Sequence, residues 1–260
     1  MVPGLKAPNN LKIDFAPSPR QYEVWKNLQP ECPECGGRVI QVKTGIDRNG
    51  NPVYSSVCDK CGNNNILQMI LCGGAAGGGK SYLGSCWLIS SCLRWPDMRM
   101  VVARKTLKSL RESTWNTIQA VAKSWGLEEQ VHYKINNLSG EMIFWNGSKI
   151  IMKEMAYSSS DPDYLRFGSS EFSGAFVDEV GEVDQRGVDV LFSRIRWKIA
   201  DTTKVPKMLM STNPCLGWVR DRFVLDENAE PVVCRPNEMY IPFSVYDNPD
   251  KEFVNAYVSA

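Results

Sequence analysis

One stretch decides how this chain folds: Gly74-Ala75-Ala76-Gly77-Gly78-Gly79-Lys80-Ser81, which fits the Gly-x-x-x-x-Gly-Lys-Ser phosphate-binding loop. An apolar run of strand length, residues 66–72, precedes it, and residues 82–94 after it have the pattern of a helix. Glycines at this junction let backbone N–H groups and the helix N-terminus face phosphates. We expect Lys80 to reach the β- and γ-phosphates and the Ser81 hydroxyl to bind Mg²⁺. The stretch therefore predicts a site for a nucleoside triphosphate with magnesium.

Two adjacent carboxylates follow a second apolar strand about a hundred residues further on. Residues 174–177 are apolar, and Asp178 and Glu179 come directly after them. In a Walker-B arrangement the first acid holds Mg²⁺ through its water shell, and the second polarises the water that attacks the γ-phosphate. An Asp-Glu pair at a strand end is common by itself as a solvated turn. Together with the upstream loop, it favours ATP hydrolysis over phosphoryl transfer to another acceptor.

A third apolar strand, residues 207–210, ends in Ser211-Thr212-Asn213-Pro214. Its last polar residues are expected at the carboxyl edge of the same parallel sheet, where ligands bind in open α/β folds. Thr212 and Asn213 are therefore candidates for sensing the γ-phosphate. The alternative is an ordinary exit from a strand, which the proline terminates.

Near the amino end, a short helix is predicted after two prolines, with Ser18 as its cap. Gln21 lies in its first turn and carries both a donor and an acceptor, which suits the edge of adenine. Tyr22 and Phe15 offer faces for stacking. Taken alone, this element is a weak signal.

Two Cys-x-x-Cys-Gly sequences stand on either side of a predicted hairpin. They place Cys32 with Cys35 and Cys58 with Cys61, and four thiolates make a closed tetrahedral Zn²⁺ site. We interpret residues 30–63 as a structural zinc ribbon, in preference to an iron site, a metal-free segment or disulfides. Contact of the ribbon with DNA and contact with another subunit both stay open. The remaining cysteines are expected to be small core residues: Cys72, Cys86, Cys92, Cys215 and Cys234.

Composition agrees with a globular protein: the chain has 260 residues, 43% hydrophobic and 23% charged, with no apolar run long enough to cross a membrane. A formal net charge of +1 argues against a globally basic DNA-binding protein, so any contact with DNA must come from local clusters. One candidate cluster contains Arg99, Arg104, Lys105, Lys108 and Arg111, which fits a solvated helix face equally well.

In order along the chain, the motifs resemble the large terminase subunits of tailed bacteriophages, whose N-terminal ATPase domain drives DNA into the procapsid. The resemblance spans nearly the whole chain. It rests on Pro17-Ser18-Pro19-Arg20-Gln21, the glycine loop, residues 101–106 and 110–113, residues 165–168, Asp178-Glu179 and residues 211–214.

The resemblance implies a role for each matching residue. Arg20 and Gln21 would contact adenine, and Asp178 and Glu179 would form the Walker-B pair. Thr212 and Asn213 would couple hydrolysis to motion. In these ring motors an arginine from the neighbouring subunit completes the site, and Arg166 matches that position best. The alternatives are Arg104, Arg194 and Arg196.

The predicted fold is an α/β P-loop NTPase of the ASCE type, a mostly parallel sheet flanked by helices. Its ATPase domain comprises residues 1–29 and 64–260, with the ribbon inserted between them. Further elements are expected as a strand at 100–103, a helix at 107–125, a hairpin of 141–145 with 149–152 across Asn146-Gly147, a helix at 183–199, a helix near 218–223, a strand near 239–241 and a helix after 250. The residues after 214 leave no room for the nuclease domain of a large terminase, so no nuclease activity is expected of this chain.

The partners that this family implies are double-stranded DNA, the portal protein and the small terminase subunit, with no membrane involved. We expect a homo-oligomeric ring on the portal, a monomer in isolation, and a place in the host cell cytoplasm. Two alternatives are a fragment of a superfamily-two helicase or translocase, which would need a second motor domain, and a zinc-ribbon scaffold with weak ATPase activity.

Overall fold

A central, mostly parallel sheet organises the computed structural model, which describes residues 1–46, 48, 50, 52–197 and 205–259. Within these residues the sheet has eight strands in the order β10-β3-β9-β8-β4-β7-β6-β5, and all neighbours from β10 to β7 are parallel. The strands are β3 (Met69–Gly74), β4 (Arg99–Arg104), β5 (Tyr133–Asn136), β6 (Glu141–Phe144), β7 (Lys149–Glu154), β8 (Gly174–Val177), β9 (Met208–Thr212) and β10 (Glu238–Phe243). The strand β9 lies between the P-loop strand β3 and the strand β8 that leads to Asp178-Glu179. This arrangement confirms the predicted fold class.

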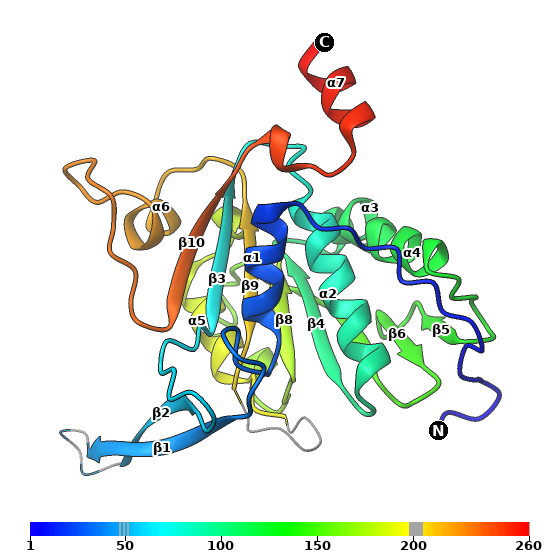
Figure 1. Ribbon diagram of the computed structural model, residues 1–260, viewed down its shortest axis with the longest axis horizontal. Helices are drawn as coiled ribbons and strands as arrows, with labels where there is room; N and C mark the ends of the chain where they lie inside the picture. The colour runs from blue at the N-terminus through cyan, green and yellow to red at the C-terminus, as the bar shows by residue number, and fades with distance from the viewer. Residues whose placement is uncertain (47, 49, 51, 198–204, 260) are drawn as a thin grey trace.

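Helices cover both faces of this sheet (Figure 1). One face is covered by α1 (Pro19–Leu28), α2 (Lys80–Arg94), α3 (Leu107–Glu112) and α4 (Thr114–Ser124), and the other by α5 (Gln185–Ser193) and α6 (Trp218–Phe223). The last helix, α7 (Lys251–Ser259), follows β10. The described chain also contains three short 3-10 turns: Leu165–Phe167, Val180–Glu182 and Val245–Asp247.

Strand β3 shows why its sequence is continuously apolar. Ile70 and Cys72 face the core beneath α1 and α2, whereas Met69 and Leu71 face the core beneath α5 and α6. Alternate side chains of a strand point to opposite faces, so a strand covered on both sides has no polar positions. This double burial fixes the end of β3, and therefore the phosphate loop, in the middle of the molecule.

Several elements differ from the sequence-based expectation in their limits. The helix expected over 107–125 is two helices, because the backbone at Ser113 leaves the helical region (φ −124°, ψ −88°). The helix expected over 183–199 begins after its cap Asp184 and ends at Ser193, and the end of the expected range lies outside the described residues. Residues 145–148 separate β6 from β7, and the hydrogen bond from Phe144 N to Ser148 O encloses three residues instead of the expected two.

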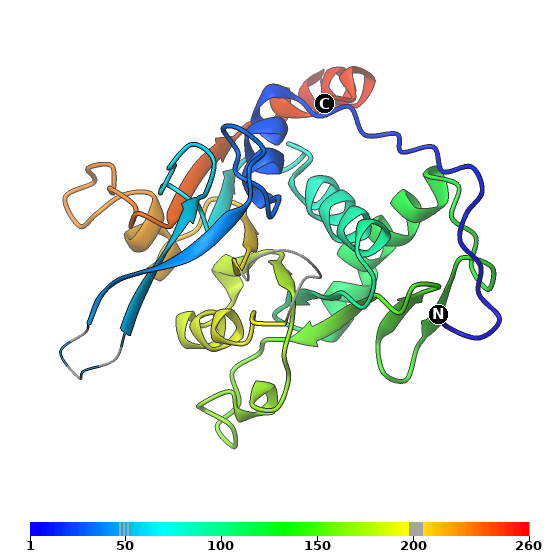
Figure 2. The same ribbon diagram turned by 60° about the horizontal axis from the view of Figure 1, so that its bottom comes forward.

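The ribbon forms a separate antiparallel sheet of β1 (Val39–Ile46) and β2 (Pro52–Cys58). It projects away from the main sheet (Figure 2). At its root, Val39 and two of the cysteines pack against Ile66 and Val205, which lie just before β3 and β9. The ribbon is thus anchored on the segments that lead into two central strands.

Buried Lys207 reinforces this junction. Its ammonium donates to the carbonyl of Asn27 at the end of α1 (2.8 Å) and to that of Leu67 before β3 (2.6 Å). Burial lowers the pKa of Lys207 to about 7. Three segments distant in sequence are therefore held together where the ribbon joins the sheet. Among the described residues, no helix is both long enough and apolar enough to cross a lipid bilayer.

Candidate functional site

The glycine loop has the backbone that its sequence predicts. Gly74 ends β3 at φ +127°, and a Cβ there would lie 2.0 Å from the carbonyl oxygen of Phe243 on β10, so only glycine fits. Gly79 begins α2 from the left-handed region (φ +78°). Around the loop lies a cavity of about 440 Å³, and Thr117, Glu179 and other residues complete its walls. This cavity at a helix N-terminus is suited to phosphate groups.

Lys80 points back into the loop. Its Nζ donates to the carbonyls of Gly74 (3.0 Å) and Ala75 (2.7 Å) and to Asn213 Oδ1 (3.3 Å). Burial lowers its pKa, while the carboxylates of Glu179 and Asp178 act in the opposite direction. The ammonium is therefore held beside the loop by oxygen atoms that phosphate oxygens can replace.

Asp178 is a buried carboxylate surrounded by hydroxyl groups. Its Oδ1 accepts from Ser81 Oγ at 3.1 Å and from Ser211 Oγ, and its Oδ2 accepts from Thr114 Oγ1. A hydroxyl and a carboxylate converging at the loop are the oxygen donors that Mg²⁺ prefers. Ser81 and Asp178, singled out in the sequence as magnesium ligands, are therefore in contact. Ser211 and Thr114 were not assigned a role from the sequence.

Glu179 is held beside the same cavity, but by different partners. It adopts a left-handed backbone conformation (φ 52°), and its carboxylate accepts from the side-chain amide (2.9 Å) and the backbone N–H (3.2 Å) of Asn213. Burial raises the pKa of Glu179, and the Asn213 backbone N–H opposes this rise. Asn213 thus bridges Glu179 and Lys80 in one chain of hydrogen bonds.

Three other predicted residues are placed less directly. Thr212 does not line the cavity around the loop, and its hydroxyl donates to the carbonyl of Asn213. Gln21 is fully buried against the loop: its amide donates to Gly79 O (3.2 Å), and its oxygen accepts from Ser18 N (3.1 Å). Arg20 is exposed and lies 4.0 Å from Glu23. Contact of Gln21 and Arg20 with adenine stays a prediction, and Gln21 would have to exchange partners to make it.

Arg166 lies outside the walls of this cavity. Its guanidinium pairs with Asp161 (2.9 Å), donates to the carbonyl of Ala156 (2.6 Å) and lies over the ring of Tyr164. Its proposed action on a neighbouring subunit stays a prediction. Arg104 at the end of β4 donates to Ser113 Oγ (2.6 Å), and its positive charge acts to lower the pKa of Glu179 against the rise caused by burial.

The candidate cluster of basic residues is not one patch. Arg99 and Arg104 stand at opposite ends of β4, and Arg99 lies over the ring of Trp197 (3.5 Å). Lys105, Lys108 and Arg111 are exposed and belong to the other end, around α3. A DNA contact that used all five residues is therefore not supported.

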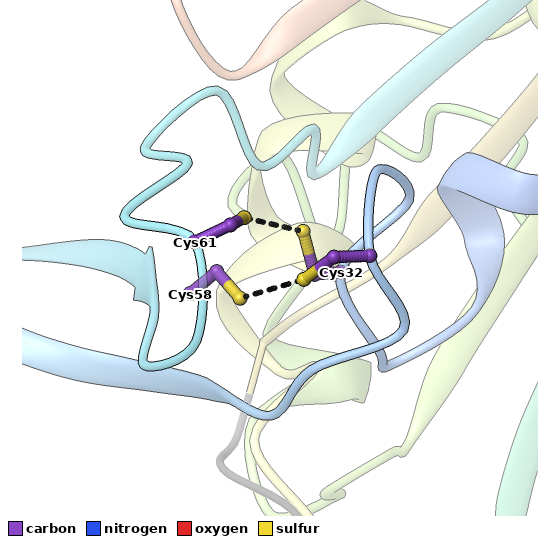
Figure 3. A group of neighbouring side chains, drawn as sticks. Cys32, Cys58 and Cys61 are labelled. Atoms are coloured by element: carbon purple, nitrogen blue, oxygen red, sulfur yellow. Dashed lines mark hydrogen bonds between the residues drawn. The ribbon is translucent and has the colours of Figure 1, made fainter.

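The four ribbon cysteines meet in one cluster, whose sulfur atoms all lie within 4.8 Å of one another. Figure 3 shows the thiol of Cys32 directed toward that of Cys61 (3.7 Å), and Cys35 and Cys58 are 3.4 Å apart. Tetrahedral Zn–S bonds of about 2.3 Å would place sulfur atoms about 3.8 Å apart. The cluster therefore has the dimensions of a four-sulfur metal site.

The thiols of the cluster differ in acidity because they interact with one another. Burial disfavours the thiolate of Cys32, but backbone N–H groups of Glu34 and Cys35 outweigh it and hold the pKa at about 6. For Cys61 a backbone N–H of Asn63 favours the thiolate, yet the neighbouring thiols raise the pKa to about 12. Four thiolates this close together need a cation to balance their charge.

Comparison with known proteins identifies the same family that the sequence motifs resemble. A family model described as phage terminase large subunit matches residues 66–258. No match is found among curated proteins.

Among solved structures, the large terminase of a thermophilic bacteriophage is similar with a TM-score of 0.57 and 16% identity, over 94% of this chain and 50% of that one. The same terminase in complex with ATP-gamma-S gives a TM-score of 0.54 and 16% identity, over 93% and 49%. Its ADP complex gives 0.51 and 17%, over 76% and 46%. This chain therefore spans about half the length of the terminases that it matches, and the likeness shows a shared fold.

Proposed function

This chain belongs to the phage terminase large subunit family, and we propose that it hydrolyses ATP as the motor domain that packages viral DNA. One observation carries the proposal: the glycine loop, Ser81-Asp178 and the Lys80-Asn213-Glu179 chain of hydrogen bonds meet around one cavity. Each component has a distinct partner in a bound nucleoside triphosphate. A glycine-rich turn that binds nothing would need none of them.

In the proposed mechanism, backbone N–H groups of the loop bind the phosphates, and Lys80 exchanges its carbonyl partners for phosphate oxygens. Ser81 and Asp178 would hold Mg²⁺, which would supply positive charge beside the phosphates. Glu179 orients and polarises the attacking water. Its raised pKa makes this carboxylate a better proton acceptor than an exposed one.

Asn213 supplies a physical basis for sensing nucleotide. In the structure it holds Lys80 with its side-chain oxygen and Glu179 with its side-chain nitrogen. When Lys80 turns to a γ-phosphate, Asn213 loses the partner of its side-chain oxygen, and its side chain can then rotate and release its hydrogen bond to Glu179. We infer that Asn213, rather than Thr212, reports phosphate to the chain beyond β9.

The finer parts of the function rest on the family. We propose that the energy of hydrolysis moves double-stranded DNA into a procapsid, in a ring assembled on the portal and loaded by the small terminase subunit. Arg166 would complete the site of the neighbouring subunit. For this contact to form, either the ion pair between Arg166 and Asp161 opens or the two residues move together.

We also propose that the ribbon holds one structural Zn²⁺ with Cys32, Cys35, Cys58 and Cys61. A site closed by four sulfurs leaves no position for a substrate. Its place at the root of the hairpin, against Ile66 and Val205, supports a structural function.

The test of the function is ATP turnover with and without double-stranded DNA, combined with nucleotide binding. Glu179→Gln keeps the size of the side chain but removes the base, so ATP should bind normally while turnover falls by at least about a hundredfold. Lys80→Ala should weaken binding and turnover together. Turnover of Glu179→Gln at the parental rate would refute the assignment of Glu179, and an inactive parent that binds no nucleotide would refute the function.

A further inference from the structure

The break between α3 and α4 brings an unassigned hydroxyl to the magnesium site. Thr114, the first residue of α4, is 1% exposed, and its Oγ1 donates to Asp178 Oδ2. Ser81 and Ser211 both donate to the other carboxylate oxygen. Within the described part of the chain, Thr114 is the side chain that donates a hydrogen bond to Oδ2.

The local structure around Ser113 is built to place Thr114 there. Ser113 leaves the helical region, and its hydroxyl donates back to Ser109 O (2.7 Å) while accepting from Arg104 (2.6 Å). The chain thereby restarts a helix with Thr114 turned toward the end of β8.

We propose that Thr114 is a positioning residue for nucleotide-bound Mg²⁺. Thr114 acts by fixing the orientation of the Asp178 carboxylate. This inference rests on the proposed function. A carboxylate bonded through one oxygen rotates about its Cβ–Cγ bond, whereas one bonded through both oxygens presents a fixed edge. Partners that orient metal-binding groups in this way typically change metal affinity by about 10- to 100-fold when they are removed.

A purely structural function for Thr114 gives a different expectation. Valine has nearly the shape of threonine and lacks only the hydroxyl, so Thr114→Val keeps the packing and removes the hydrogen bond to Asp178. If Thr114 served only to fill space, Thr114→Val would leave metal-dependent binding unchanged. The experiment therefore measures linkage between magnesium and nucleotide, without relying on turnover.

The measurement is the dissociation constant of a fluorescent ADP analogue, determined with excess EDTA and with excess Mg²⁺. The dissociation constant in EDTA divided by the dissociation constant in Mg²⁺ reports how strongly Mg²⁺ supports nucleotide binding. For Thr114→Val we expect this ratio to fall about tenfold or more, with the EDTA value within about twofold of the parent. Thr114→Ser, which restores a hydroxyl, should recover the parental ratio.

The matched control is Ser148→Ala, which removes another fully buried hydroxyl. Ser148 donates to Trp95 O and lies directly before β7, whereas Asp178 follows the end of β8. Ser148→Ala should keep the parental ratio even if stability falls. Should Thr114→Val fail to fold, Thr114→Cys provides a weak donor of similar size, for which a partial loss is expected.

An unchanged ratio in a folded Thr114→Val or Thr114→Cys protein would overturn the inference, and so would a parent that binds the analogue equally well with and without Mg²⁺. A parent that binds no nucleotide under either condition would overturn the proposed function together with the inference.

Discussion

Replacing Cys35 by serine should unfold the ribbon and leave the ATPase core folded. Among the described residues, the buried apolar cluster at the root of the ribbon contains three aliphatic side chains, Val39 of the ribbon and Ile66 and Val205 of the segments that it packs against. At about 1.5–3 kcal/mol for each buried side chain, they contribute about 5–9 kcal/mol. A two-stranded hairpin with so small a core is marginally stable at best. A structural zinc site contributes on the order of 10 kcal/mol or more, so the metal decides whether the ribbon folds.

The assay combines elemental analysis with limited proteolysis. The parent should contain about one equivalent of zinc and resist cleavage within residues 31–46 and 52–62, whereas Cys35→Ser should lose zinc and be cut there rapidly. Cys234→Ser is the control, because Cys234 is half-buried and lies outside the four-sulfur cluster. A zinc-free parent with a protected ribbon, or a Cys35→Ser protein that keeps zinc and protection, would refute this reasoning.

Three further predictions concern the site and its support. Mixing two inactive proteins, Arg166→Ala and Glu179→Gln, under conditions of assembly should restore part of the turnover, because some interfaces then pair an intact Glu179 with an intact Arg166. An arginine acting in trans is worth about 10³- to 10⁵-fold in rate. No recovery in confirmed assemblies would indicate a cis function or another arginine. Burial raises the pKa of Glu179, and Asn213→Ala removes a side-chain donor to its carboxylate. The acid limb of the pH–rate profile should therefore move to higher pH, and a move to lower pH would contradict the assignment. Lys207→Met leaves two buried carbonyls without their donor and should lower the free energy of unfolding by about 1–3 kcal/mol, as measured by urea denaturation.

Much of the fold could be predicted because each sequence motif marks the end of a particular strand. The glycine loop, the Asp178-Glu179 pair and the residues up to Asn213 identify β3, β8 and β9, three parallel strands that are adjacent in the sheet. The break at Ser113 was missed because apolar residues recur on both sides of it. One sign of the break was present: Leu110 and Trp115 are both buried but five residues apart, which a single helix face does not accommodate.

Contacts between polar side chains and nucleotide were less predictable, because they depend on which hydrogen-bond donors and acceptors have no partner within the protein. Gln21 has the chemistry to contact adenine, but a sequence cannot show that its amide already bonds to Gly79 and Ser18. Thr212 and Asn213 are equivalent as polar residues at a strand end, yet only Asn213 lines the cavity. Which polar atoms are already bonded is a property of tertiary packing, and no local pattern records it.

The adjacent acids Asp178 and Glu179 show how far a local pattern can go. Their order in the sequence predicts separate functions in metal binding and water activation, and the structure holds the two carboxylates in different surroundings. Asp178 continues the sheet through a hydrogen bond from its backbone N–H to Ala103 O (2.9 Å), so its carboxylate is held among buried hydroxyls. The chain then turns at Glu179, whose positive φ directs its side chain to Asn213 instead. Two neighbouring carboxylates thus avoid a shared site, where their repulsion would keep one of them protonated, and each retains the environment that its proposed function requires.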